Sequence, residues 1–170
     1  MKHIFSKDKY PLVVDPGMIV GGKYWGVQAQ YKGAMPFVCI YKFDNEIWFL
    51  GTRSVAGHEI YIPSRNNMII ENSLNWNEIR DLTFKVKLYL MWDNFTAIGR
   101  IPSYKDIETV DYDNNHYCID HKYWLSSEST TEHGFYVNEW GYIKGDAIKT
   151  DRTIGVVPIV KLRFKGGEEN

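Results

Sequence analysis

Turn signals recur in the first third of this chain at intervals of about ten residues, and this spacing restricts the fold more than any other feature of the sequence. The signals are Gly21-Gly22, Lys32-Gly33 and Asp44-Asn45-Glu46, and the extended or apolar runs beside them are residues 23–31, 36–43 and 47–52. Connections this short join antiparallel strands, because a parallel pair needs a long crossover. The sequence therefore predicts an N-terminal β meander.

Residues 75–91 fit two different structures. Asn75 and Glu78 have the spacing of a capping box, in which each side chain accepts a hydrogen bond from the backbone of the other residue. One helical face would then hold Ile79, Leu82, Val86, Tyr89 and Leu90. The segment also alternates as a half-buried strand would, with one side formed by Leu82, Phe84, Val86, Leu88 and Leu90. The cap and the length favour a helix, and a strand is the alternative.

A second helix and a return to β structure are predicted further along. Ser103 follows a proline and stands three residues before Asp106, which predicts a short helix that Val110 ends. We then expect a strand at residues 123–127, a hairpin around Trp140-Gly141 and a largely buried strand at residues 154–164. Pro158 interrupts that last strand, which indicates an edge or a bulge rather than a central position in the sheet.

Aromatic residues are the unusual part of the composition, at 15% of the 170 residues. The formal net charge is −1, whereas a protein that binds nucleic acid through its phosphates normally carries a basic excess. Many rings are typical of β structure, of a contact surface, or of both. We therefore expect one domain over residues 1–170 and no nucleic-acid partner.

The sequence also bears on compartment. Residues 1–15 are polar and lack the apolar core of a signal peptide, and no window approaches the roughly 18 apolar residues of a membrane helix. Cys39 stands in an apolar run and predicts a buried free thiol, with one disulfide to Cys118 as the alternative. These features predict cytoplasmic synthesis and no membrane partner, and they are compatible with later assembly into a virion.

Four short motifs follow one another between residues 95 and 164. They are Arg100-Ile101-Pro102-Ser103 before the expected helix, Tyr123-Trp124-Leu125-Ser126-Ser127-Glu128, Gly134-Phe135-Tyr136-Val137 and Gly155-Val156-Val157-Pro158-Ile159-Val160. In this order they are similar to bacterial and phage C-type-lectin-like domains, whose branches include collagen-like adhesin C-terminal domains and formylglycine-generating enzymes. Val157 departs from the pattern, because the family has arginine before the proline, so any contact of that arginine is missing here.

The resemblance implies a fold more than a function. It implies an α+β protein with a C-type-lectin-like core of short antiparallel strands and about two helices over residues 70–165, after the N-terminal β meander. The family would place its first helix near residues 75–91, in agreement with the capping box.

Metal sites are not expected. Sugar-binding relatives hold Ca²⁺ with Glu-Pro-Asn or Gln-Pro-Asp and with Trp-Asn-Asp, and none of these tripeptides occurs here. The loop at residues 111–115 starts like an EF-hand, but His116 and Lys122 stand where that loop needs glycine and glutamate. His116, Cys118 and His121 are weak zinc candidates, because no second ligand pair accompanies them. We therefore expect no cofactor.

An enzyme is the less favoured interpretation. The formylglycine-generating branch uses two closely placed cysteines near its C-terminal half to activate oxygen through copper, and only Cys118 lies in that half here. The sequence has neither a nucleophile-elbow glycine pattern nor a P-loop. An oxygenase-like enzyme of that branch remains an alternative.

A recognition surface is what the resemblance then implies, on the loops and strands between residues 111 and 142. Its candidate binding residues are Tyr112, Tyr117, Glu128, His133, Tyr136, Asn138, Trp140 and Tyr142. We assign Trp124 and Phe135 to the core, and Trp140 beside Gly141 is the best candidate for an exposed ring. Aromatic rings flanked by polar groups supply much contact area at little rotamer cost.

These observations predict a non-enzymatic recognition module of phage type. It would bind a host protein or a surface glycan through its aromatic-rich face, as a single copy or as a homo-oligomer. A cytosolic phage-encoded inhibitor of a host defence protein is the alternative among binding proteins.

Overall fold

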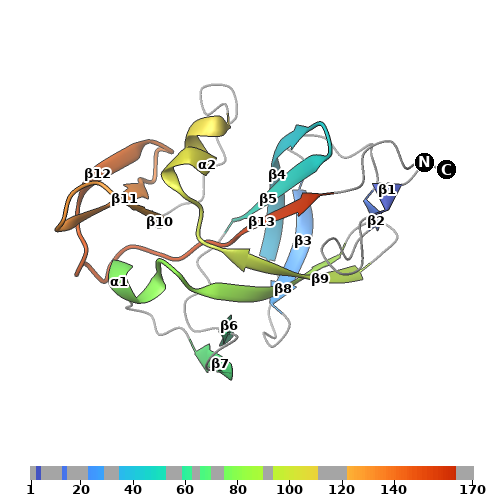
Figure 1. The fold of residues 1–170 in the computed structure, drawn as a ribbon, viewed down its shortest axis with the longest axis horizontal. Coiled ribbons are helices and arrows are strands. Elements are labelled where there is room, and N and C mark those ends of the chain that lie inside the picture. The colour runs from blue at the N-terminus through green and yellow to red at the C-terminus, as the bar shows by residue number, and fades with distance from the viewer. Residues whose placement is uncertain are drawn as a thin grey trace.

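The computed structural model is mostly antiparallel β structure with two short helices (Figure 1). It describes residues 3–4, 13–14, 23–28, 35–52, 59–62, 66–69, 75–89, 94–110 and 122–163. Figure 1 shows a large sheet at the right, a three-stranded sheet at the left, and α2 above the space between them. Within the described residues no helix is long and apolar enough to cross a membrane.

Six strands of the large sheet close into a ring. In order they are β3 (Lys23–Gln28), β4 (Met35–Phe43), β5 (Glu46–Gly51), β13 (Ile159–Arg163), β9 (Asn94–Arg100) and β8 (Thr83–Tyr89). Because β8 also pairs with β3, the first and last strands of this order are neighbours. The hairpin of β6 (Glu59–Ile62) and β7 (Asn66–Ile69) joins the start of β8, and β1 (His3–Ile4) pairs separately with β2 (Val13–Val14).

The predicted meander is confirmed as β3, β4 and β5. The β4–β5 connection is the predicted turn, in which Asp44 has a φ of 55°. Residues 37–40 and 47–50 are buried without alternation, because successive side chains of β4 and β5 enter two different cores. Phe37, Cys39 and Phe49 belong to one core, and Val38, Ile40 and Leu50 belong to the other. Cys39 is the predicted buried free thiol.

The long helix favoured for residues 75–91 is wrong, although its start is confirmed. Asn75 Oδ1 accepts a hydrogen bond from the Glu78 backbone N at 3.1 Å, and Glu78 Oε1 accepts one from the Asn75 backbone N at 3.0 Å. The helix α1 (Trp76–Ile79) then ends, and residues 83–89 form β8. The strand alternative prevails because β8 pairs with β9 along its whole length and with β3 on its other edge.

The second predicted helix is confirmed as α2 (Tyr104–Thr109), with Val110 as its C-cap. Ser103 Oγ accepts from the Asp106 backbone N at 3.0 Å, and Asp106 Oδ2 accepts from the Ser103 backbone N at 2.9 Å. Ile107, the central apolar residue of this helix, is buried in the core that contains Val38 and Leu50. The short helix therefore covers the outer face of the β4–β5 hairpin.

The expectation that Pro158 marks an edge strand or a bulge is wrong. Strand β13 begins at Ile159 and lies between β5 and β9, near the middle of the large sheet. Pro158 stands one residue before the strand, where no ladder hydrogen bond requires its missing N–H. Its carbonyl instead accepts a hydrogen bond from the Gly51 backbone N at 2.9 Å, which ties the entry of β13 to the end of β5.

The last third forms the predicted strand and hairpin. The three-stranded sheet consists of β10 (Tyr123–Glu128), β11 (His133–Val137) and β12 (Ile143–Ile148), paired in that order. Trp76 of α1 joins it to the ring, because its indole Nε1 donates to the Leu125 carbonyl at 2.8 Å. Trp124 is buried as predicted, and Phe135 is half-buried and packs against the core, with its ring centre 4.7 Å from that of Tyr104.

Candidate functional site

The turn between β11 and β12 carries two exposed aromatic rings. Trp140 is 70% exposed and Tyr142 is 61% exposed, which agrees with the predicted exposure of Trp140. Both belong to the predicted recognition surface. We call Trp140 and Tyr142 the hairpin tip.

Asn138 holds the backbone of this turn. Its Oδ1 accepts hydrogen bonds from the backbone N of Trp140 at 3.0 Å and from that of Tyr142 at 2.9 Å. The Asn138 backbone adds two more bonds, one from its N to the Tyr142 carbonyl and one from the Gly141 N to its carbonyl. Gly141 has a φ of 89°, a conformation that other residues rarely adopt. The backbone that carries both rings is therefore fixed before any partner arrives.

Glu128, the last residue of β10, and His133, the first residue of β11, lie at the other end of the small sheet, where they organise the β10–β11 loop. Glu128 Oε2 accepts from Lys149 Nζ at 2.5 Å, and Lys149 Nζ also donates to the Thr131 carbonyl at 2.7 Å. The hydrogen bond from Lys149, together with its charge, lowers the pKa of Glu128 below its ordinary value. His133 Nδ1 lies 2.8 Å from Thr130 Oγ1.

Tyr136 lies between these two ends, in the middle of β11. Its hydroxyl donates to Asp146 Oδ1 at 3.0 Å, and its ring meets that of Trp124 edge-on at 6.4 Å. Burial, reinforced by the Asp146 carboxylate, raises the pKa of Tyr136 to about 12. Tyr136 and Asp146 also line a hollow of about 400 Å³ together with Lys122 and Asp151.

The predicted binding residues thus fall into separate groups. Asn138, Trp140 and Tyr142 come together at the hairpin tip, while Glu128 and His133 belong to the opposite end of the small sheet. Tyr112 and Tyr117, and the weak zinc candidates His116, Cys118 and His121, lie outside the described residues. In the part of the chain that the structure describes, no three His, Cys, Asp or Glu side chains gather as a metal site would require.

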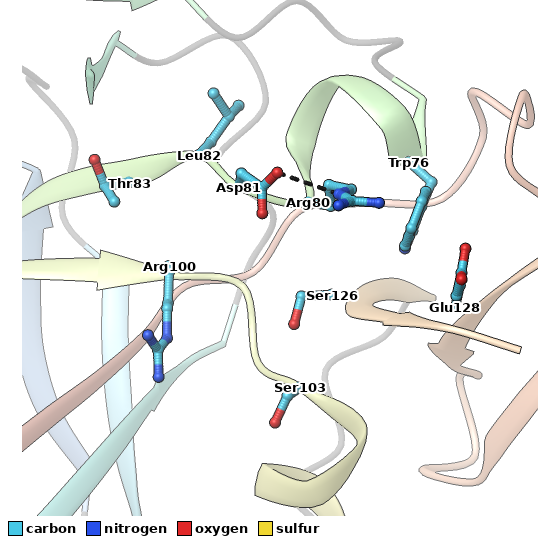
Figure 2. Close-up of a pocket in the computed structure, with 9 residues that line it drawn as sticks. All are labelled: Trp76, Arg80, Asp81, Leu82, Thr83, Arg100, Ser103, Ser126 and Glu128. Atoms are coloured by element: carbon cyan, nitrogen blue, oxygen red, sulfur yellow. Dashed lines mark hydrogen bonds and ion pairs between the residues drawn. The ribbon is translucent and has the colours of Figure 1, made fainter. Parts of the chain in front are cut away.

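A cleft of about 570 Å³ lies where the small sheet meets the ring, and no pattern in the sequence predicts it (Figure 2). It is lined by Trp76, Arg80, Asp81, Leu82, Thr83, Arg100, Ser103, Ser126 and Glu128. These residues come from three segments: α1 with its link to the first residue of β8, the last residue of β9 with the link to α2, and β10.

The charged groups of this cleft are unevenly paired. Arg80 Nε donates to Asp81 Oδ2 at 3.2 Å, and the Arg80 guanidinium lies 4.9 Å from the centre of the Trp76 ring. Glu128 is paired with Lys149. Among the described residues, no hydrogen bond or ion pair engages the Arg100 guanidinium. In the sequence Arg100 is only the first residue of a fold motif, and nothing in the local pattern indicates that it lines a cleft.

Comparisons of this chain with models of protein families, with curated proteins and with solved structures find no match.

Proposed function

We propose that this protein is a non-enzymatic recognition module of phage type, which contacts a host protein or a surface glycan through the hairpin tip. The observation that carries the proposal is the exposure of Trp140 and Tyr142 on a turn whose backbone is already hydrogen-bonded in place. Exposed aromatic rings are the side chains that most often dominate binding energy when a partner covers them.

The rigidity of the turn favours binding over a merely structural role. A ring on a flexible loop would have to be ordered on association, and that ordering opposes binding. Here Asn138 and Gly141 order the backbone beforehand, so only the side-chain rotamers of the two rings remain to be fixed. Trp and Tyr lose few rotamers for the area that they bury.

The lectin-like resemblance supports the same function. Its motifs fall on the start of α2, on β10, on β11 and on the entry to β13, and the hairpin tip directly follows β11, one of the strands on which they fall. The proposed C-type-lectin-like core is therefore the part of the chain that presents the two rings.

One thiol does not suit the copper chemistry of the oxygenase-like alternative. Burial raises the pKa of Cys39 to about 11, so the thiol is protonated at neutral pH and is a poor metal ligand. Its Sγ lies 3.7 Å from the Tyr41 carbonyl, inside the apolar core of the ring.

The test compares two exposed aromatic residues. Wild type, Trp140→Ala and Phe43→Ala are immobilised and used to capture partners from host lysate, with a glycan array in parallel. Phe43 is the matched control, because it is 69% exposed but lies at the β4–β5 turn.

We expect Trp140→Ala to weaken capture by about 2 kcal/mol or more, the range of a binding hot spot, and Phe43→Ala to leave it unchanged. Unchanged affinity of a folded Trp140→Ala variant, or equal losses in both variants, would overturn the proposal.

A further inference from the structure

We infer that the cleft between α1, β9 and β10 binds a small organic anion, one that presents a carboxylate, sulfate or phosphate group to Arg100, with Arg80 as a second cation in the lining of the same cleft. This site is separate from the hairpin tip and does not depend on the function proposed for it. The inference rests on the pairing of charges in the cleft, on the position of Arg100 and on the size of the hollow (Figure 2).

The carboxylates of the cleft are already engaged. Asp81 accepts from Arg80 through one oxygen, and Glu128 accepts from Lys149, which also lies 4.5 Å from the centre of the Trp76 ring. Arg80 uses only its Nε in that pair, which leaves its two terminal nitrogens as donors. The cationic side chains of the cleft therefore have more N–H donors than its carboxylates accept from.

Arg100 is the main source of unused donors. Its guanidinium has five N–H groups and bonds to none of the described residues. At the end of β9 the backbone of Arg100 pairs with Thr83 of β8 on one side and with Ile159 of β13 on the other. Two neighbouring strands therefore hold the base of this side chain in place.

A second hollow adjoins the cleft at Arg100. A groove of about 240 Å³ shares Thr83 and Arg100 with the cleft and continues past Ile98, Ile159 and Lys161. Lys161 Nζ is engaged by Asp106, so among the described residues Arg100 is the cation with unused donors where the two hollows join. A guanidinium matches the paired oxygens of a carboxylate, sulfate or phosphate through two parallel hydrogen bonds.

Two serine hydroxyls add neutral donors. Ser103 Oγ accepts from the Asp106 backbone N, and its own proton remains available to a ligand. Ser126 lies on β10 opposite Ser103, and Figure 2 shows both side chains in the hollow below Arg80. Hydroxyls beside guanidinium groups are suited to anions that also carry hydroxyl groups.

The size of the cleft sets the class of ligand. At about 570 Å³ it is far larger than a single inorganic ion and falls within the usual range of small-molecule sites. The ligand is therefore an organic molecule with an acidic group, such as a sugar acid or a sugar phosphate, rather than a free ion.

Calorimetric titration of the full chain tests this inference. The probes are glucuronate, glucose 6-phosphate, inorganic phosphate and sulfate, each measured at low and at physiological salt. The variants are Arg100→Gln and Arg80→Gln, and Arg163→Gln is the control. Arg163 carries the same charge, is paired with Glu46 at 3.4 Å and does not line the cleft. Circular dichroism establishes that each variant is folded.

We expect at least one organic probe to bind the wild type, and Arg100→Gln to weaken that binding by about tenfold or more, the effect of losing charge-assisted hydrogen bonds. Arg163→Gln and Trp140→Ala should leave it unchanged. The inference is overturned if no probe binds, if only the inorganic ions bind, or if Arg163→Gln weakens binding as much as Arg100→Gln. A loss of partner capture in Trp140→Ala with intact anion binding would separate the two sites.

Discussion

Asp106 and Lys161, which are 55 residues apart in the sequence, form an ion pair that joins the first turn of α2 to β13. The same carboxylate completes the capping box of α2 through its other oxygen. Lys161 Nζ also lies 4.2 Å from the centre of the Trp48 ring on β5. One buried acidic side chain thus fixes both the start of a helix and its position on the large sheet.

Replacing Asp106 should therefore be costly. Asp106→Ala removes one half of the capping box and leaves Lys161 without its partner, which should lower the free energy of unfolding by about 3 kcal/mol. Urea denaturation measures this change. Asp81→Ala is the control, because its side chain is 85% exposed and its pair with Arg80 should contribute less than about 1 kcal/mol. Equal effects of the two substitutions would contradict the role assigned to Asp106.

Gly134 permits the close approach of Trp76 to the three-stranded sheet. A Cβ at this position would lie 2.8 Å from Trp76 Cδ1 and 3.1 Å from Trp124 Cζ3, and both side chains are fully buried. Gly134→Ala should therefore destabilise the fold by about 1–3 kcal/mol through overpacking. Thermal unfolding followed by tryptophan fluorescence would detect the loss, and an unchanged melting temperature would show that α1 packs differently.

Asn138 should act on binding through the backbone of the hairpin tip. Asn138→Ala removes the acceptor of two backbone N–H groups, and we expect a loss of stability of about 1 kcal/mol and weaker partner capture with both rings still present. Asn138→Asp retains an acceptor oxygen and should restore capture. If Asn138→Ala captures the partner as well as wild type does, preorganisation of the turn is unimportant.

The ion pair of Glu128 and Lys149 should contribute to the way in which the stability of the protein declines at acid pH. Because the pKa of Glu128 in the folded protein lies below its ordinary value of 4.5, the pair stabilises the fold above that pH and this contribution is lost as the pH falls further. Glu128→Gln should therefore flatten the decline of stability below pH 4.5. Unfolding measured across the acid range in both proteins provides the test, and parallel curves would contradict it.

Local signals predicted short elements well. The capping boxes at Asn75 and Ser103 were both identified, because their hydrogen bonds depend only on residues three apart. What the cap at Asn75 does not determine is the length of the helix that follows. Pairing of β8 with β9 and β3 overrides helical propensity beyond Ile79, and those partners lie elsewhere in the sequence.

The candidate sites divide in the same way. The hairpin tip was predictable because its turn residues and rings are neighbours in the sequence. The anion-binding cleft was not, because Arg80, Arg100 and Ser126 come from three segments that meet only after α1, β9 and β10 have packed. The position of β13 was mispredicted for a related reason. Pro158 shows only that one residue cannot donate a ladder hydrogen bond. It does not indicate which strands lie on either side of residues 159–163.

The position of β13 has a consequence for the order of folding during synthesis. Strands β5 and β9 both precede β13 by many residues in the sequence. In the sheet, however, β13 lies between them. Until residues 159–163 leave the ribosome, both strands present open edges, which are prone to pair with other chains. The ring can close only late, through contacts between distant residues, and such topologies fold slowly. A nascent chain that stops before Ile159 should therefore need protection from aggregation, and the full chain should not.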